Sequence, residues 1–323
     1  MTISAMIRST LKLSTVFPLL AALALPAFVE AAIPHSKTIV SRLAKNSGRG
    51  VYVVEQEVRF SGPEGITLKE RWLVQNSDVM RLIVQDVRTQ NQRGDFRWDA
   101  LYRGGRRIAS VPAHASPAGS TEPGKAVTAP AAQTTPQNTA LSGEFFESFL
   151  FHRTSARFFE SFVKNKILPP SALRERARIG NIANYKPTAE PAVRLGRTSG
   201  VVAWVFGEPT PIDHAANYPG AWIEQDNFIL RKIRLPSQAE MTLGNHQNAG
   251  RGLRLPRERT ITWHSGDSAR EIRSATIKVT SARAMAENSL APQFQPASIT
   301  PGELKAARLP DSATVREFYS RFR

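Results

Sequence analysis

The sequence has 323 residues, no cysteine and a formal net charge of +16 at pH 7, from 43 Lys and Arg against 27 Asp and Glu. The absence of cysteine excludes disulfides, thiolate metal sites, a cysteine nucleophile and a lipid anchor attached to a cysteine. The positive charge is typical of a solvated basic face, and it also suits anionic partners such as lipid headgroups or an anionic membrane surface.

Residues 1–31 have the three parts of a cleavable secretory signal peptide. Arg8 and Lys12 supply positive charge, Leu13–Leu25 is apolar, and small residues stand at positions −3 and −1 of a cleavage site that follows Ala31. The apolar segment is shorter than the about 20 residues of a membrane-spanning helix. The sequence therefore predicts export to the periplasm of a bacterial envelope, which argues against nucleic acid as the partner of the basic surface.

Residues 32–112 are predicted to contain a short helix followed by the first half of a β domain. His35–Asn46 has apolar residues at helical spacing. The segments that follow alternate apolar and polar residues, which is typical of half-buried strands, and Gly104-Gly105 between the last two favours a tight hairpin. These segments are Val51–Phe60, Ile66–Gln75, Met80–Val84, Phe96–Arg103 and Arg106–Val111.

Residues 113–140 differ in composition from the strands on either side. They are rich in Ala, Pro, Thr, Ser and Gln, with almost no large apolar side chain. Such a segment buries too little surface to offset the entropy of ordering it, so we predict a disordered insert.

Residues 141–283 are predicted to complete the same domain with a long helix and a second set of strands. Gly143–Leu168 carries an apolar stripe at helical spacing and ends at Pro169-Pro170. Because strands and helices do not alternate, an antiparallel, mainly β fold is expected rather than a parallel sheet. The strands are expected at Val201–Phe206, Ala221–Glu224, Phe228–Leu235, Thr260–His264 and Arg270–Thr280, before a polar tail, 284–323, with a basic helix at Ser312–Arg323.

Residues suited to catalysis or metal binding are few, so we predict a protein that is not an enzyme and has no cofactor or metal. The motifs of serine hydrolases, Walker loops and dinucleotide-binding loops are missing from the sequence. None of the six histidines has a second ligand at helical metal spacing. Asp213-His214 is interpreted as a surface turn, and His264 as a half-exposed strand residue.

Aromatic residues are the unusual feature of the sequence. All five tryptophans lie on predicted strands, and the long helix contains seven phenylalanines. Two interpretations remain open: a closed core between sheet and helix, or an apolar cavity that accepts acyl chains. In the second case the lining is predicted to comprise Trp72, Leu82, Trp98, Phe145, Phe149, Phe159, Val163, Trp204 and Trp222.

The order and spacing of several segments carry a family resemblance. The meander from Val51 to Val84 is followed at a distance by Trp222–Asn227, Leu255–Arg257 and Trp263–Arg270. Together they resemble the periplasmic lipoprotein-carrier superfamily, LolA- and LolB-like, and especially its divergent outer-membrane lipoprotein-sorting-like members. The resemblance implies a curved, unclosed antiparallel β-barrel with helices on its concave face, which holds lipid or lipoprotein acyl chains.

One position departs from that family. The carriers have an arginine before a proline after the second long strand, where it latches the lid helix, whereas this chain has Gln75–Asp78 there and Arg81 is the nearest basic residue. A carrier of acyl chains toward the outer membrane therefore stands beside a non-enzymatic binding, sensing or structural module of the same fold.

Overall fold

The computed structural model describes residues 33–62, 65–86, 97–110, 136–173, 193–207, 218–266, 271–299, 310 and 312–323. All helices and strands named below belong to one compact unit, His35–Arg323. The predicted signal peptide and most of the predicted insert lie outside the described residues.

The described residues of the unit form a single antiparallel sheet of 13 strands in the order β6-β5-β4-β3-β2-β1-β13-β12-β11-β10-β9-β8-β7. Among the described strands, β6 and β7 stand at opposite ends of this order and do not pair, so the sheet is not closed into a barrel. The predicted mainly β, unclosed antiparallel architecture is confirmed. The strands are β1 Val51–Phe60, β2 Thr67–Asn76, β3 Val79–Asp86, β4 Arg97–Arg103, β5 Arg106–Ser110, β6 Pro136–Ala140, β7 Val193–Thr198, β8 Val201–Phe206, β9 Gly220–Glu224, β10 Leu230–Arg234, β11 Glu240–Asn248, β12 Arg254–His264 and β13 Ile272–Met285.

The meander of β1 to β5 follows from alternation and turn chemistry. Tyr52, Val54 and Val58 of β1 all point into the main core, as their period of two requires. Gly104 and Gly105 join β4 to β5 with φ of +57° and +76°, values that glycine adopts without steric cost and that a two-residue hairpin needs. The predicted hairpin is confirmed.

Three strands were missing from the sequence prediction, and β12 begins at Arg254, earlier than the predicted Thr260. Residues 136–140, assigned to the disordered insert, form β6 and pair with β5. β7 and β11 were not predicted, because only two residues of β7, Val193 and Leu195, are large and apolar, and the second half of β11 is polar. Pairing with a neighbouring strand determines these segments more than their own composition does.

The predicted helix Gly143–Leu168 is not continuous. It consists of a 3-10 helix, η2 Phe146–Leu150, and an α-helix, α3 Ser155–Lys164. The break occurs because Thr154 is extended and its side chain accepts a hydrogen bond from the backbone N–H of Arg157, which starts a new helix. Predicted helices at the two ends of the unit are confirmed as α2 Ser36–Lys45 and α5 Ala313–Arg321.

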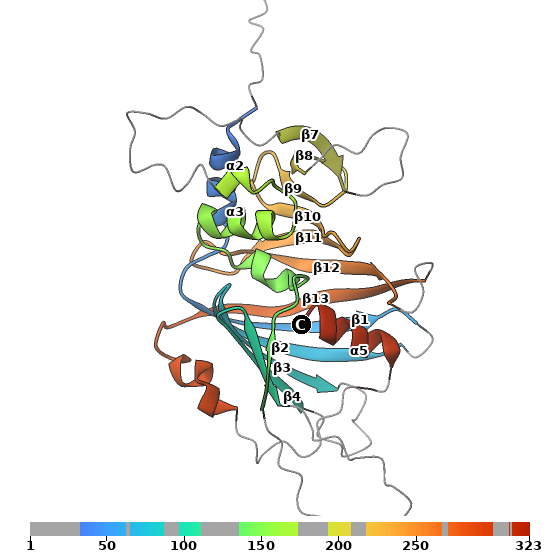
Figure 1. Ribbon diagram of the computed structural model, residues 1–323. Coiled ribbons are helices and arrows are strands. Elements are labelled where there is room, and N and C mark those ends of the chain that lie inside the picture. The colour runs from blue at the N-terminus through green and yellow to red at the C-terminus, as the bar shows by residue number, and fades with distance from the viewer. Residues whose placement is uncertain are drawn as a thin grey trace, which may run out of the picture. The chain divides into compact units, whose positions relative to one another are not determined.

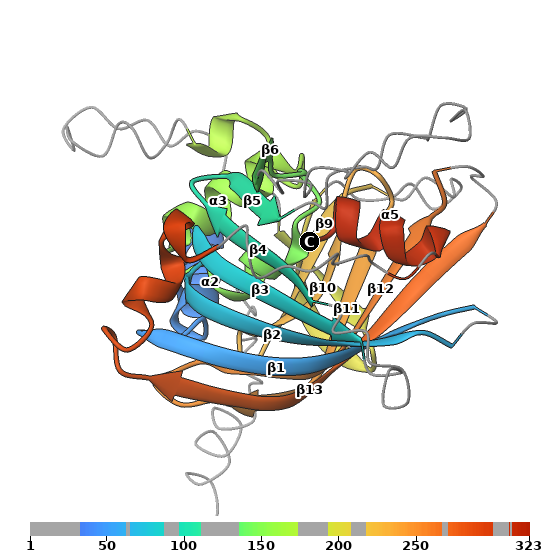
Figure 2. The same cartoon turned by 90° about the horizontal axis from the view of Figure 1, so that it is seen from below.

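All four of these helices lie on the concave side of the curved sheet (Figures 1 and 2). They share one apolar core with the inward-facing residues of the strands. The segment 284–323, predicted as a polar tail, contributes to this core, because Val315, Phe318, Tyr319 and Phe322 of α5 and its C-cap are fully buried.

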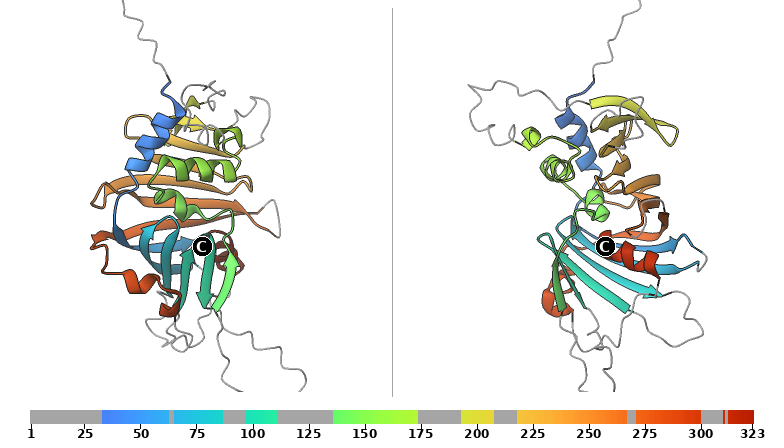
Figure 3. Two further views of the ribbon diagram at one scale, coloured as in Figure 1. Left: turned by 60° about the vertical axis from the view of Figure 1, so that its left-hand side comes forward. Right: turned by 45° about the vertical axis from the view of Figure 1, so that its right-hand side comes forward.

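A second, smaller core lies on the opposite face of the sheet. Two short 3-10 helices, η4 Ala291–Phe294 and η5 Pro296–Ser298, cover apolar residues of β1, β2 and β4 there (Figure 3). Arg81 of β3 points to this side, where it forms an ion pair of 2.6 Å with Asp99 and donates hydrogen bonds to the Gln293 side chain and the Ser298 hydroxyl. Arg81 is therefore directed away from the helices of the concave face.

Candidate functional site

Six of the nine predicted lining residues are buried in the core on the concave face, and two of these six, Phe145 and Phe149, line a pocket. The six come from several elements that are far apart in the sequence. They are Trp72 and Leu82 from β2 and β3, Trp98 from β4, Phe145 and Phe149 from the η2 region, and Trp204 from β8.

Phe159 and Val163 are displaced from the centre of the site. The residues of α3 that are fully buried against the sheet are Phe158 and Phe162, whereas Phe159 and Val163 are only partly buried at the edge of the core. The predicted stripe assumed one helical phase from Phe145 to Ile167. Because the helix is broken before Ser155, the rotation of α3 about its axis is independent of η2. The residues that face the sheet are therefore one position earlier, at Phe158 and Phe162.

Trp222 is on the wrong face for the predicted lining. Its neighbours on β9, Ala221 and Ile223, point into the core, so alternation turns Trp222 to the other side of the sheet. There the Lys232 ammonium lies 4.9 Å and the Arg234 guanidinium 5.4 Å from the centroid of its ring. Its role is a cation–π contact on the outer face.

Several aromatic residues of the site were not predicted. Tyr102 stacks on Phe145 with 4.7 Å between ring centroids and also contacts Trp72 at 5.5 Å. Phe162 contacts Phe149 and Phe206. Because Trp98, Ala100 and Tyr102 alternate along β4, the sequence indicated that Tyr102 faces the same side as Trp98. No comparable pattern indicated that Phe162 faces inward.

A buried cluster of charged side chains crosses the centre of the concave face. Its four charged members are Glu70, Glu147, Arg259 and Arg323, each almost fully buried. Arg323 Nε lies 3.0 Å from Glu70 Oε1, and Arg323 Nη2 lies 3.2 Å from Glu147 Oε1. Arg259 Nη1 donates to Glu147 Oε2 at 2.6 Å. Two negative and two positive charges thus balance one another where water is excluded.

Neutral groups complete the coordination of Glu70. Its carboxylate accepts hydrogen bonds from Gln56 Nε2 at 2.6 Å, Tyr319 Oη at 2.8 Å and Trp72 Nε1 at 3.0 Å. Burial by itself would raise the pKa of Glu70, but the charge of Arg323 and the hydrogen bonds from Arg323, Tyr319 and Trp72 outweigh it and lower the pKa below its usual value. Glu70 is therefore ionised at neutral pH, although it is inaccessible to solvent.

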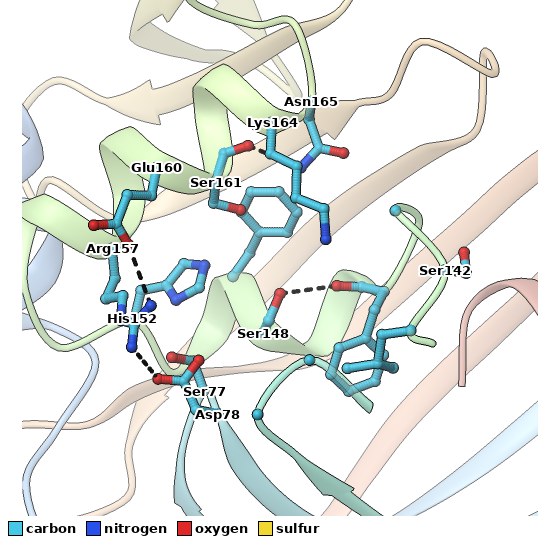
Figure 4. A pocket seen from close by; sticks show the side chains of 16 residues that line it. Ser77, Asp78, Ser142, Ser148, His152, Arg157, Glu160, Ser161, Lys164 and Asn165 are labelled. Carbon is cyan, nitrogen blue, oxygen red and sulfur yellow. Dashed lines mark hydrogen bonds and ion pairs between the residues drawn. The ribbon is translucent and has the colours of Figure 1, made fainter. Parts of the chain in front are cut away.

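A pocket of about 550 Å³ opens between α3, η2 and the turns at the ends of β2 and β4 (Figure 4). Its walls include Phe145 and Phe149, which belong to the aromatic lining, together with Leu141. Its rim is polar, with Arg157 paired to Asp78 at 2.8 Å and to Glu160 at 3.2 Å. Lys164 also lines the pocket and has no ion pair among the described residues. Leu141, Phe145 and Phe149 thus form an apolar part of a lining whose other side chains are mostly polar or charged.

His152 lies in the wall of the pocket as a buried, uncharged group. Its ring packs edge-on against Phe149 at 5.8 Å and Phe158 at 5.1 Å, and neither ring nitrogen has a hydrogen-bond partner among the described residues. Burial, with a smaller contribution from the charge of Arg157, lowers the pKa of His152 to about 3. An imidazole that stays neutral and unpaired contributes to the apolar wall.

The described residues bring together no group of three or more His, Asp or Glu side chains able to hold a metal ion. Asp213 and His214 lie outside the described residues, and His264 is exposed on β12. The arrangement on the concave face is suited to binding an amphipathic molecule.

Within the described residues, none of the helices reaches the length and apolarity of a membrane span.

Comparison with known proteins gives similarities of fold. The sequence matches no family model and no curated protein. The structure is similar to the crystal structure of a LolA superfamily protein from Nitrosomonas europaea, with a TM-score of 0.44 and 11% identity over 78% of this chain and 94% of that one. It is also similar to a putative outer membrane lipoprotein-sorting protein domain from Vibrio parahaemolyticus, with a TM-score of 0.41 and 12% identity over 78% and 94%.

A third similar structure is a DUF1329 family protein from Desulfovibrio piger, with a TM-score of 0.45 and 11% identity over 82% of this chain and 100% of that one. Each of the three similarities covers at least 78% of this chain.

Proposed function

We propose that this chain is an exported periplasmic protein that binds an acyl chain of a lipid or lipoprotein between the concave face of its sheet and the covering helices. The observation that carries the proposal is the pocket beside η2 and α3. Its volume of about 550 Å³ falls in the range of roughly 300–1,000 Å³ typical of ligand sites. Phe145 and Phe149 connect it to the buried aromatic lining.

The charged mouth of the pocket suits the polar end of such a ligand. Lys164 offers a positive charge that no described carboxylate neutralises, next to an apolar wall. A fatty acid or an anionic phospholipid would place its negative headgroup near Lys164 and its chain against the phenylalanines.

Gly143→Trp tests the pocket without disturbing the core. Gly143 lines the pocket, and a Cβ added there would meet no other atom within 4 Å. We expect the indole to occupy the space of the ligand and weaken the binding of a fluorescent fatty acid at least tenfold, measured by titration. Because an added Cβ meets no neighbouring atom and the position lines the pocket, the free energy of unfolding should change by less than about 1 kcal/mol.

Gly244→Trp on β11 is the matched control. Gly244 alternates with the inward-facing Met241 and Leu243, and an added Cβ there would lie 3.9 Å from the Glu258 carbonyl oxygen, with nothing else so near. This variant should bind the fatty acid as tightly as the parent protein. Equal binding by both tryptophan variants, or no binding by the parent, would contradict the proposal.

One observation favours a binding or sensing module over a carrier. Arg81, the nearest basic residue to the position where carriers have their latch arginine, is engaged with Asp99 on the opposite face of the sheet. Transfer of a fluorescent lipid between vesicles separates these functions, since a carrier accelerates transfer whereas a sensing or structural module binds lipid without doing so.

The export proposal has its own test. If the signal peptide is cleaved after Ala31, N-terminal sequencing of the protein from the periplasmic fraction should begin at Ala32. A full-length product retained in the membrane would contradict it.

A further inference from the structure

Exposed basic side chains gather at one end of the sheet, where the C-terminal end of α2 meets the turn from β11 to β12. Ser47, just after α2, forms a β-bridge with Leu253 in that turn, and the Arg254 backbone N–H donates to the Asn46 carbonyl oxygen at 2.8 Å. Both segments lie on the left-hand side of Figure 1. These backbone contacts bring five exposed side chains to one surface, which we call the basic patch: Arg42, Lys45, Arg49, Arg251 and Arg254.

The charges of the basic patch are not balanced by the fold. None of its five side chains forms an ion pair with a carboxylate of the described residues. At the other end of the sheet, by contrast, Arg234 is paired with Glu240 at 2.9 Å. Arg273, at the start of β13, is paired there with Glu317 at 2.8 Å. Within the part of the chain that the structure describes, unneutralised positive charge is therefore concentrated at the α2 end.

A further arginine lies next to the basic patch. Arg153 is half-buried and donates a hydrogen bond from Nη2 to the Gly50 carbonyl oxygen. The Arg251 guanidinium lies over the same glycine, since a Cβ added there would be 2.6 Å from Arg251 Nη1. Glu287, which follows β13, is near enough for its charge to act on Arg153, but one negative charge leaves this surface strongly positive. Like charges at this spacing repel one another, and an anionic surface relieves the repulsion.

The basic patch is a surface rather than a binding pocket. The cavity beside it, lined by Asn46, Ser47 and Arg254 among others, has a volume of about 20 Å³. That is room for roughly one water molecule, and too little for a phosphorylated small molecule. A bilayer, in contrast, offers many phosphate groups side by side to all five side chains at once.

The basic patch and the acyl pocket lie at the same end of the sheet. The pocket is lined by Asp78 in the β2–β3 turn and by Gly104 in the β4–β5 turn. Strand pairing places both turns at the end where β1 begins, directly after the α2 segment. His152 in the pocket wall is followed in the chain by Arg153. A protein that lies on a bilayer through the basic patch therefore holds the pocket at the same end as the lipid.

We infer that the basic patch is a docking surface for an anionic phospholipid bilayer. The attraction is electrostatic, and each positive side chain at such a surface strengthens binding about fivefold, so the attachment is reversible and weakened by salt. Docking needs no acyl chain in the pocket and is independent of the function proposed above.

Lys45→Gln with Arg49→Gln tests the docking surface. Both side chains are exposed and make no hydrogen bond among the described residues, so the fold should be unaffected. Binding is measured by flotation with vesicles of equal amounts of phosphatidylglycerol and phosphatidylcholine. We expect the double variant to bind at least tenfold more weakly than the parent, because two contributions of about fivefold are lost. The parent should not bind vesicles of phosphatidylcholine alone.

Arg59→Gln with Lys278→Gln is the matched control, because it lowers the net charge by the same amount. Both residues are exposed, and at about 3.3 Å per residue along β1 and β13 they lie about 20 Å or more from the basic patch. This exceeds the about 10 Å over which exposed charges interact in salt. The control should bind within about twofold of the parent. Equal losses in the two double variants, or no binding of the parent to the anionic vesicles, would overturn the inference.

Gly143→Trp separates docking from acyl binding, because it fills the pocket and leaves the basic patch unchanged. It should bind the anionic vesicles as tightly as the parent. Loss of vesicle binding in this variant would assign that binding to the pocket and overturn the docking surface. If the parent docks but binds no fatty acid, the proposed function fails and the docking surface stands.

A fluorescent label gives the orientation of the docked protein directly. Because the chain has no cysteine, a fluorophore can be attached to Lys45→Cys or, with the same loss of charge, to Lys278→Cys. On saturating anionic vesicles, a phospholipid with a quencher on its headgroup should quench the label at position 45 at least twofold more than the label at position 278. Equal quenching at the two positions would show that the protein does not lie on the bilayer through the basic patch.

Discussion

Replacing Glu70 by glutamine is expected to lower the free energy of unfolding by about 3–5 kcal/mol, the usual cost of breaking a buried ion pair by removing one partner. The change preserves the shape of the side chain but leaves Arg323 with only Glu147 as a counter-ion, in a cluster whose charges otherwise balance. Urea unfolding followed by circular dichroism measures the loss.

Glu55→Gln on the neighbouring strand is the matched control. Glu55 also faces an arginine, Arg71 at 4.0 Å, but both side chains are more than 40% exposed. An exposed pair of this kind contributes little, so the variant should lie within about 0.5 kcal/mol of the parent. If Glu70→Gln lowered the free energy of unfolding as little as Glu55→Gln does, water would have to reach the charged cluster.

The double variant Glu70→Met with Arg323→Met separates the interaction between these two residues from the interaction of each with the rest of the core. Since it removes both charges and leaves none unpaired, it should be more stable than either single methionine variant. Glu147 and Arg259 remain as a pair of 2.6 Å within the same core. A double variant less stable than both single ones would contradict the account of the cluster as balanced buried charge.

Glu70 also predicts how stability responds to acid. Its pKa in the folded protein lies below the ordinary value of 4.5, so the ionised carboxylate stabilises the fold above that pH. As the pH falls below 4.5, the unfolded chain takes up a proton that the folded chain resists, and stability is lost toward the folded pKa. In Glu70→Gln this contribution to the loss of stability below pH 4.5 should be absent.

The strands could be predicted where apolar and polar residues alternate along the segment itself. They were predicted less well where the strand forms because an adjacent strand pairs with it. β1 to β5 follow from side-chain period and a glycine turn, and β8 matches its predicted bounds, Val201–Phe206. β6 and β7, at the two ends of the strand order, contain few apolar residues and are strands because a neighbouring strand pairs with them. Sequence alternation carries no information about that partner.

The central cluster of the site could not be predicted from local patterns. Glu70 and Arg323 are 253 residues apart in the sequence, and each looks like an ordinary charged residue among many. Only the curvature of the sheet and the return of α5 bring them together. The burial of most of the predicted aromatic residues could be expected because tryptophan and phenylalanine indicate burial individually, whereas a buried charge cannot be recognised until its partner is known.

His152→Leu is expected to change the pH dependence of stability between pH 7 and pH 5. The folded protein holds this imidazole neutral, with a pKa of about 3, whereas an unfolded histidine titrates near 6.5. Below pH 6.5 the unfolded chain therefore binds a proton that the folded chain does not. The parent protein should lose about 1.4 kcal/mol per pH unit from this group between pH 6.5 and 3, or about 2 kcal/mol by pH 5.

The leucine variant lacks this loss, because its side chain does not titrate. Its stability relative to the parent should rise by about 2 kcal/mol between pH 7 and pH 5, measured by urea unfolding at each pH. His264→Leu, at an exposed position of β12, controls for the removal of a histidine as such. Parallel stability curves for the parent and His152→Leu would mean that the imidazole gains a proton inside the folded protein, and that water reaches this wall of the pocket.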